Sequence, residues 1–245
     1  KSTYIYNMYP ETDELHREKI QNHAVTYIGS LVPTKGFHVL AAVWKTILKE
    51  VPDATLNVVG NGKLYGRNSK LGKYNIAEDS YEKQFMSGLT DDEGNILPSV
   101  HFWGVLGVEK NDVIRNTCVG VVNPTGRTET FGISALDFES MSVPVVTIAK
   151  GGFLDTVLNE KTGLLYGHTD DFAKDIIMLL KNDKLNEQYG RDGVQLCKKF
   201  TPDKIIKEWN RLFLKVLNDE KMEYIEPDSF METNLKKYRC LNRKI

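Results

Sequence analysis

Short apolar runs alternate with amphipathic segments along the chain from about residue 24. Residues 24–29 (AVTYIG) are rich in β-branched and aromatic side chains and end at Gly29-Ser30, which predicts a strand. In residues 37–50 apolar side chains recur at helical spacing, and Pro52 follows closely. The same alternation predicts further strands at 55–59, 100–103, 118–123, 145–148 and 163–166, and helices near 78–89, 110–115 and 132–141.

The pattern becomes helical toward the end of the chain. One helix is expected to begin at Thr169, and another at Thr201 with Pro202 in its first position. After Leu217 the periodicity fades into a charged tail. Strands and helices that alternate at short loop lengths predict an α/β fold, a doubly wound, mostly parallel (Rossmann-like) sheet with helices on both faces. In such sheets ligands bind outside the carboxyl ends of the strands, so the loops after the strands are where chemistry is expected.

Composition and charge narrow the class of protein. The chain has 245 residues, and its 27% of charged residues with a net charge of -1 give no reason to expect a dedicated nucleic-acid binder. The three cysteines, Cys118, Cys197 and Cys240, form no disulfide framework or CxxC pair, which favours a reducing cytoplasm. We find no membrane-spanning run and no signal peptide, and because the chain opens at Lys1 rather than Met, we expect a fragment of a longer protein.

Two loops near the start of the sheet are candidate ligand contacts. The loop 29–36 (GSLVPTKG) places Lys35 just before a helix, where a cation beside free helix amides makes an anion site; a solvated surface lysine is the alternative. The loop Gly60-Asn61-Gly62-Lys63 lets the backbone approach a ligand, or is simply a tight turn. No GxGxxG follows the first strand, which disfavours a dinucleotide oxidoreductase.

The loop 123–133 (NPTGRTETFGI) is the most informative, because it leads from a buried strand into a helix. Glu129 lies just before that helix, and the amides of about 131–134 would favour a diphosphate. A plain capping carboxylate is the alternative for Glu129. A last loop, 150–155 (KGGFLD), also offers close backbone approach, with an ordinary left-handed turn as its alternative. Because Lys35, Gly62, Gly104, Glu129 and Gly152 each follow an expected strand, we expect them around one cleft.

Taken together, these loops resemble the family 4 glycosyltransferases of the GT-B fold, specifically their C-terminal donor-binding domain. The matching stretches are YIGSLVPTKGFHVL, ATLNVVGNGKL, VHFWGVL, VVNPTGRTETFGISALDFESMSVPVV and IAKGGFLDTVLNEKTGLLY, and the resemblance covers about residues 24–218. It implies that Lys35 steadies the donor diphosphate and that Glu129 acts near the donor sugar. It also implies a set of donor-binding residues: Gly29, Ser30, Gly60, Asn61, Gly62, Lys63, Gly104, Thr130, Phe131, Gly132, Ile133 and Asp137.

Two positions depart from the family pattern. Ser30 stands where the family usually has an Arg, which removes one of two diphosphate-binding cations; Arg127 and Lys63 are candidates to replace it. Asp137 stands where a Glu usually binds the ribose hydroxyls. We expect Asp137 and not Glu139 to face the ribose, because two residues rotate a helix by about 200°.

The resemblance also implies an organisation. Residues 1–23 are expected to be an interdomain linker, 24–218 the nucleotide-sugar donor-binding domain, and 219–245 a C-terminal tail, with an N-terminal acceptor-binding domain missing. The tail carries Lys236, Lys237, Arg239, Arg243 and Lys244; a solvated tail is the simpler interpretation, and contact with the cytoplasmic face of an anionic membrane is the alternative. The family needs no metal or other cofactor, and the five histidines show no ligand spacing.

The function that follows is a retaining transferase that moves a hexose from a UDP-sugar to a glycan or glycolipid acceptor, as in polysaccharide biosynthesis. Three alternatives stay open: a GT-B-fold nucleotide-sugar epimerase, a sugar phosphorylase, or a non-catalytic nucleotide-sugar-binding partner of an active transferase. The departures at Ser30 and Asp137 motivate the last of these.

Overall fold

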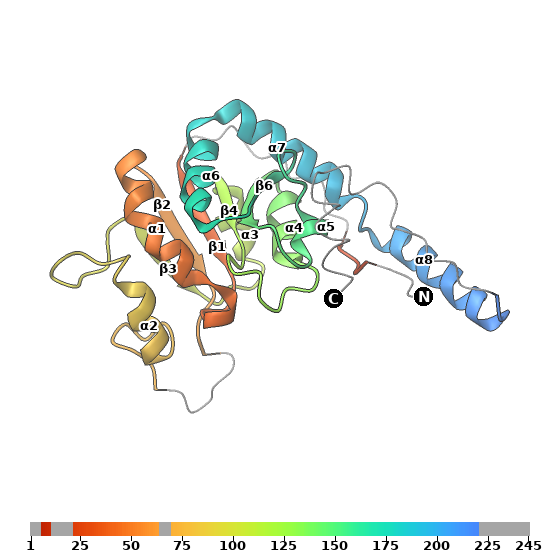
Figure 1. Ribbon diagram of the computed structural model, residues 1–245, viewed down its shortest axis with the longest axis horizontal. Helices are drawn as coiled ribbons and strands as arrows, with labels where there is room; N and C mark the ends of the chain where they lie inside the picture. Colours follow the sequence, from red (N-terminus) through yellow and green to blue (C-terminus); the bar gives the residue numbers. More distant parts are fainter. Residues whose placement is uncertain (1–5, 11–21, 64–69, 221–245) are drawn as a thin grey trace.

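One six-stranded parallel sheet forms the centre of the protein. The computed structural model describes residues 6–10, 22–63 and 70–220. The strands are β1 (Ala24–Ile28), β2 (Thr55–Val59), β3 (Val100–Gly104), β4 (Val119–Val121), β5 (Val145–Ile148) and β6 (Gly163–Tyr166). They run in the order β3-β2-β1-β4-β5-β6, and every neighbouring pair is parallel (Figure 1). This confirms the α/β, doubly wound fold expected from the sequence.

Helices cover both faces of the sheet. They are α1 (Phe37–Glu50), α2 (Asp79–Met86), α3 (Lys110–Arg115), α4 (Ile133–Glu139), α5 (Phe153–Thr156), α6 (Thr169–Lys181), α7 (Asp183–Cys197) and α8 (Pro202–Leu217), with a short 3-10 turn, η1 (Pro33–Lys35), before α1. One core cluster joins α1, α2 and α6 to the sheet, with Phe37, Trp44 and Phe172 fully buried. A second cluster on the other side contains Phe138 and Phe153, from α4 and α5. Strands between two cores must be apolar on both faces, which explains the unbroken apolar run at β4.

A third core cluster attaches residues from the start of the chain. Tyr6 and Tyr9 are buried there with Phe131, Leu136 and Phe200. The backbone amide of Tyr9 donates to the carbonyl of Phe200 (2.8 Å), and the Tyr6 ring packs edge-on against the Phe200 ring. The segment of residues 6–10, which we call the N-terminal strap, therefore lies against the side of the domain formed by α4 and the end of α7.

The helix α7 is an element that the hydrophobic pattern did not single out. Gly190 and Gly193 lie within it and lower its intrinsic helix propensity. They lie where α7 packs on α4 and the turn after it: a Cβ on Gly190 would come within 2.1 Å of the Ser142 carbonyl oxygen, and one on Gly193 within 3.0 Å of the Glu139 Cβ. Tertiary packing has outweighed the local preference.

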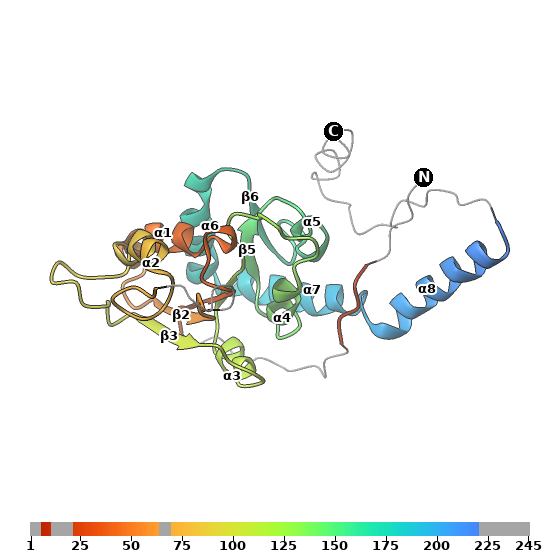
Figure 2. The same cartoon turned by 90° about the horizontal axis from the view of Figure 1, so that it is seen from below.

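The last helix, α8, runs outward from the body of the domain (Figures 1 and 2). It begins at Pro202 as expected, although the Thr201 side chain makes no capping hydrogen bond, and α6 starts with Thr169 inside the helix rather than at its cap. Only Ile205 of α8 is buried. Leu212 is half-buried, and the other large apolar side chains of the helix are exposed: Ile206, Trp209, Phe213, Leu214, Val216 and Leu217.

The expected basic tail, with Lys236, Lys237, Arg239, Arg243 and Lys244, lies outside the described residues, as does most of the expected linker 1–23. A search of the helices within 6–10, 22–63 and 70–220 finds none whose length and hydropathy would let it cross a bilayer.

Candidate functional site

The loop between β1 and α1 fixes Lys35 at the carboxyl edge of the sheet. The buried Tyr27 hydroxyl donates to the carbonyl of Lys35 (2.8 Å), so the backbone of Lys35 is anchored to the core. Gly36 then enters α1 with φ 72°, a left-handed conformation that favours glycine. A Cβ at Gly36 would also lie 2.8 Å from the amide nitrogen of Thr125, so the next loop passes close by.

The loop between β4 and α4 is held against the first. The Thr125 hydroxyl donates to the carbonyl of Thr34 (2.8 Å), and the Asn123 amide donates to the carbonyl of Arg127 (2.9 Å). Gly132 enters α4 with φ 90°. Two loops that lie far apart in the sequence thus form one surface, because β1 and β4 are neighbours in the sheet.

Lys35 and Glu129 form an ion pair where these loops meet. The Lys35 Nζ lies 3.0 Å from the Glu129 Oε2, and the two side chains are 26% and 18% exposed. Asn123 also donates to Oε2 (3.2 Å), and the Gly132 amide donates to Oε1 (3.1 Å). The expectation that Lys35 and Glu129 lie at the same end of the sheet is confirmed. The carboxylate also holds the backbone of Gly132, the residue before α4, although α4 has no side-chain capping hydrogen bond.

The neighbouring donor-binding candidates differ in what they can present to a ligand. The Phe131 side chain is buried in the third core cluster, so only its backbone faces the loop surface. Thr130 and Ile133 are exposed, Ile133 by 51%. The amide of Gly152 donates to the carbonyl of Glu129 (3.1 Å), which brings the loop after β5 to the same place.

The loop after β2 lies next to the first loop but opens into a separate hollow. The Leu31 amide donates to the carbonyl of Asn61, the Gly29 amide to that of Val59, and the Gly60 amide to that of Gly104. The strands β1, β2 and β3 thereby continue their pairing into the loops. Ser30 lies in this region between β1 and η1, in the position where the family pattern has an Arg.

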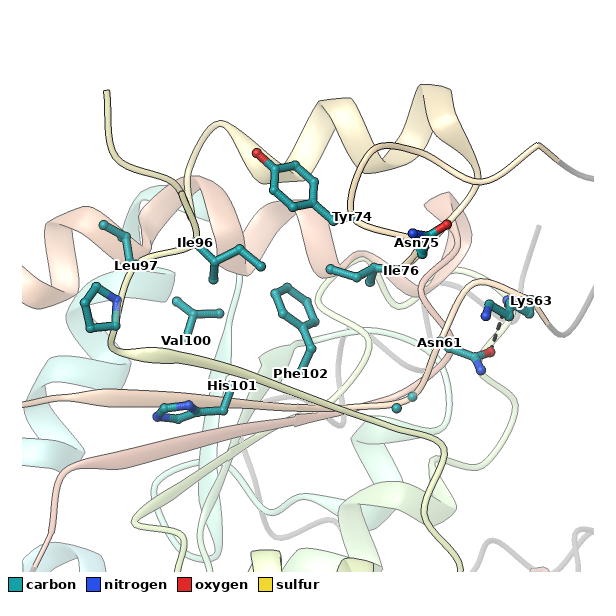
Figure 3. A pocket seen from close by; sticks show the side chains of 13 residues that line it. Asn61, Lys63, Tyr74, Asn75, Ile76, Ile96, Leu97, Val100, His101 and Phe102 are labelled. Carbon is teal, nitrogen blue, oxygen red and sulfur yellow. Dashed lines mark hydrogen bonds between the residues drawn. The ribbon is translucent and has the colours of Figure 1, made fainter. Parts of the chain in front are cut away.

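A cavity of about 610 Å³ lies beside β3 (Figure 3). Its apolar wall includes Ile76, Ile96 and Phe102, whose side chains point toward one another, whereas His101 points away (Figure 3). Of the expected donor-binding residues, its lining includes Gly60, Asn61, Lys63 and Gly104. Lys35, Gly62, Glu129 and Gly152 are not among the residues that line this cavity, and Lys35 and Glu129 lie instead where the loops before α1 and α4 meet. A single cleft around all the expected residues stays a prediction.

The two acids of α4 point in opposite directions. Asp137 is partly exposed, on the same face as Ile133, and its Oδ2 lies 2.6 Å from the Lys110 Nζ at the start of α3. Its Oδ1 accepts a hydrogen bond from the Tyr9 hydroxyl (3.1 Å).

Glu139, by contrast, is fully buried. The Thr162 hydroxyl donates to its Oε1 (2.6 Å), and its Oε2 has no hydrogen-bond partner within the described chain. Burial raises the pKa of the Glu139 carboxyl well above its usual range. The prediction that both acids cannot face the ligand is consistent with this geometry.

The structure adds three polar contacts that sequence reasoning missed: Asn123 on Glu129, and Lys110 and Tyr9 on Asp137. Lys110 was recognised only as the start of a helix, and Tyr9 only as part of a linker. No spacing in the sequence connects either residue to Asp137.

Of the two cations considered as replacements for the missing Arg, Arg127 lies nearer the ion pair. It is exposed on the loop that touches Thr34 and Gly36. The pKa of His38, in the first turn of α1, is lowered mainly by burial, and the positive charge of Arg127 lowers it further. Lys63 lines the cavity beside β3 instead, where its backbone amide donates to the Asn61 side chain (3.0 Å). Among residues 6–10, 22–63 and 70–220, no group of three His, Cys, Asp or Glu side chains could hold a metal ion.

A family described as glycosyl transferases group 1 matches residues 11–195 of the chain. The capsular polysaccharide biosynthesis glycosyltransferase CapM of Staphylococcus aureus is 26% identical over 183 residues, which are 74% of this chain and 43% of CapM. The chain spans less than half the length of the curated relatives it matches, from 40% to 49%.

Solved structures share the fold at lower identity. The Anabaena protein HepE in complex with UDP and glucose has a TM-score of 0.64 at 18% identity, covering 79% of this chain and 48% of HepE. The C-terminal domain of the group 1 glycosyl transferase LpcC from Francisella tularensis has a TM-score of 0.59 at 19% identity, covering 80% of this chain and 96% of that domain.

Proposed function

Because this chain belongs to the glycosyl transferases group 1 family, we propose that it is the donor-binding part of a retaining transferase that uses a UDP-sugar. The observation that carries the proposal is the Lys35–Glu129 pair at the carboxyl edge of the sheet. This is where open α/β sheets bind ligands, and the two charges suit the two ends of a nucleotide-diphosphate sugar. HepE, a protein of the same fold, is solved in complex with UDP, which supports this choice of nucleotide.

In the proposed reaction the bond between the sugar and the diphosphate breaks, and negative charge grows on the leaving phosphate. Lys35 meets that charge as a fixed cation, together with the backbone amides at the start of α4. Glu129 lies on the sugar side of the same pair. Because the protein already supplies a cation, we propose that transfer needs no divalent metal.

We further propose that residues 24–218 are the donor domain, that residues 1–23 lead to it from an acceptor-binding domain outside this chain, and that the acceptor is a glycan or glycolipid. The 96% coverage of the LpcC C-terminal domain supports this division, and the role of CapM in capsular polysaccharide biosynthesis supports the acceptor class. The buried thiol of Cys197 suits a reducing cytoplasm.

Titration calorimetry of the purified chain tests the proposal. UDP and UDP-hexoses should bind with equal affinity in the presence and absence of EDTA, and more tightly than ADP or GDP. Lys35→Ala should abolish most of the binding, whereas Lys49→Ala, at the exposed far end of α1, is the matched control. Loss of UDP binding in EDTA, or equal binding of all three nucleotides, would contradict the proposal.

A second experiment tests the division between donor and acceptor. Transfer requires both reactants to be held together, so this chain alone should not glycosylate an acceptor, whereas a longer protein with the preceding domain should. The anomeric configuration of its product, read by NMR, tests retention. A longer protein that binds UDP-sugar without turnover would favour the non-catalytic partner, and release of an altered UDP-sugar would favour the epimerase. A pyridoxal absorbance band would indicate a phosphorylase.

A further inference from the structure

Tyr9 connects the N-terminal strap to the exposed acid of α4. Its side chain is buried (5% exposed), yet its hydroxyl reaches Asp137 Oδ1 at 3.1 Å and lies 3.2 Å from the Ser140 hydroxyl. Burial, and next to it the Asp137 charge, raise the pKa of Tyr9 well above its usual range. The phenol therefore stays protonated, and it can donate to the carboxylate over the whole physiological pH range.

Asp137 is held from two sides and keeps capacity on both oxygens. Lys110 occupies one acceptor position of Oδ2 at 2.6 Å, and Tyr9 occupies one of Oδ1. A carboxylate oxygen accepts about two hydrogen bonds, so one position on each oxygen stays available to a pair of donors. Vicinal hydroxyl groups are such a pair. Because Asp137 is one methylene shorter than the usual Glu, its reach depends more strongly on where these two donors place it.

We propose that Tyr9 is a positioning residue for the ribose of the bound nucleotide, and that it acts by fixing the Asp137 carboxylate opposite Lys110. The proposal rests on the proposed function, since it requires a nucleotide at this site. If Tyr9 has this role, the affinity for the ribose depends on the N-terminal strap, a segment that precedes β1 in the sequence. A displacement of the N-terminal strap would withdraw one of the two donors from Asp137 and weaken nucleotide binding.

The strap supplies its own matched control. Tyr6 is buried to the same degree as Tyr9, in the same cluster, and its hydroxyl also donates to an aspartate, Asp155 Oδ1, at 3.2 Å. Asp155 is buried in α5. Tyr6→Phe and Tyr9→Phe therefore remove the same group from the same segment, and only the second removes it from an acid placed to meet a ligand.

The experiment compares UDP with 2′,3′-dideoxy-UDP, which lacks the hydroxyls that Asp137 would accept. Titration calorimetry of the unaltered chain should show a preference for UDP. In Tyr9→Phe the affinity for UDP should fall about two- to fivefold while that for 2′,3′-dideoxy-UDP stays unchanged. In Tyr6→Phe the ratio of the two affinities should equal that of the unaltered chain. A general loosening of the strap would instead weaken both ligands alike.

A double-mutant cycle separates the two proposals. In an Asp137→Asn background, Tyr9→Phe should no longer change the ratio of the two affinities, because it acts through the carboxylate. If the unaltered chain does not bind UDP, the proposed function fails. If UDP binds but Tyr9→Phe leaves the ratio unchanged, or lowers both affinities equally, only the role of Tyr9 is overturned.

Discussion

The loops that lead into α1 and α4 have similar backbone geometry but different side-chain chemistry. Both enter a helix through a glycine in the left-handed conformation, and each carries one member of the central ion pair. In the first loop, two tyrosines provide the framework, by which we mean the hydrogen bonds that hold the loop backbone. The Tyr27 hydroxyl donates to the Lys35 carbonyl, and the Tyr81 oxygen accepts from the amide of His38 (3.2 Å). The ammonium of Lys35 is not part of that framework.

In the second loop the functional side chain is itself part of the framework, because the Glu129 carboxylate accepts from the amide of Gly132. The difference teaches that substitutions at the two positions are not equivalent experiments. Replacing Lys35 removes a charge from a loop that is otherwise complete. Replacing Glu129 removes both a charge and the acceptor of the Gly132 amide, so its effects on binding and on stability must be measured separately.

The largest expected effect is that of Lys35→Ala. The ammonium contacts the diphosphate in both ligands, so the variant should weaken UDP and UDP-sugar alike by about 2–3 kcal/mol. Its melting temperature should stay close to that of the unaltered chain, because a partly exposed ion pair contributes little stability. Calorimetry and thermal unfolding measure the two quantities. A large drop in melting temperature would show that Lys35 belongs to the framework after all.

Glu129→Ala should differ from Lys35→Ala in both ligand preference and stability. We expect it to weaken UDP-sugar by about 1–2 kcal/mol more than UDP, and to destabilise the fold by about 1 kcal/mol through the lost hydrogen bond from the Gly132 amide. Glu129→Gln retains an oxygen for the Gly132 amide, so it should recover the stability without recovering the sugar contact. Equal penalties for both ligands in Glu129→Ala would leave this residue with only its structural role.

The two acids of α4 allow a similar comparison within a single helix, between an acid on the ligand side and a buried one. Asp137→Ala should weaken UDP by about 1 kcal/mol, because it removes a charged acceptor from the ligand side. Glu139→Gln should leave UDP binding unchanged, because Glu139 is buried against Thr162. Calorimetry of both variants checks this, and the reverse result would place the wrong acid at the ribose.

Glu139 should instead affect how stability depends on pH. Its pKa is raised in the folded state, so its contribution is fully present below the unfolded pKa of about 4.3 and is lost as pH rises toward the folded value. As the pH rises above about 4.3 toward the folded pKa, the unaltered chain should lose stability relative to Glu139→Gln, on the order of 1 kcal/mol per pH unit. Urea unfolding at several pH values measures the difference, and parallel curves would show that Glu139 ionises in place.

The smallest expected effect is that of salt. Raising the ionic strength should weaken UDP binding a few-fold in the unaltered chain, because the Lys35 side chain is partly open to solvent. In Lys35→Ala this dependence should be smaller. The same salt sensitivity in both proteins would assign it to another cation, with Arg127 as the first to replace.

Sequence reasoning located Lys35 and Glu129 because each lies between a strand and a helix, and because β1 and β4 must then bring them together. The period of the α-helix placed Asp137 and Glu139 on different sides of α4. It did not find Tyr9 or Lys110, because their contacts with Asp137 join three segments of the chain, and the side chains of Tyr9 and Asp137 are 128 positions apart. Contacts of that kind depend on how α3 and the strap pack, which no local periodicity encodes.

The cavity beside β3 was not predicted from the sequence for a related reason. The loops 60–63 and 104 were placed correctly at the carboxyl edge, but residues 70–98 build a wall beside β3 that their polar sequence did not suggest. Glu82 is buried there and accepts from the amides of Tyr74, Ile76 and Ala77. The backbone amides of this segment surround the Glu82 carboxylate. Such a turn has no regular spacing of apolar residues, so the hydrophobic pattern does not predict it.

The outward course of α8 has a consequence for hydrogen exchange. A helix that packs through Ile205 alone can open turn by turn without disturbing the sheet, so amides beyond its first turn should exchange far faster than those of α1, a helix of similar length with five buried residues. That contrast makes α8 a built-in reporter. Slower exchange along its exposed stripe, on adding a longer form of the protein or any partner, would register contact there even where the sheet gives no signal.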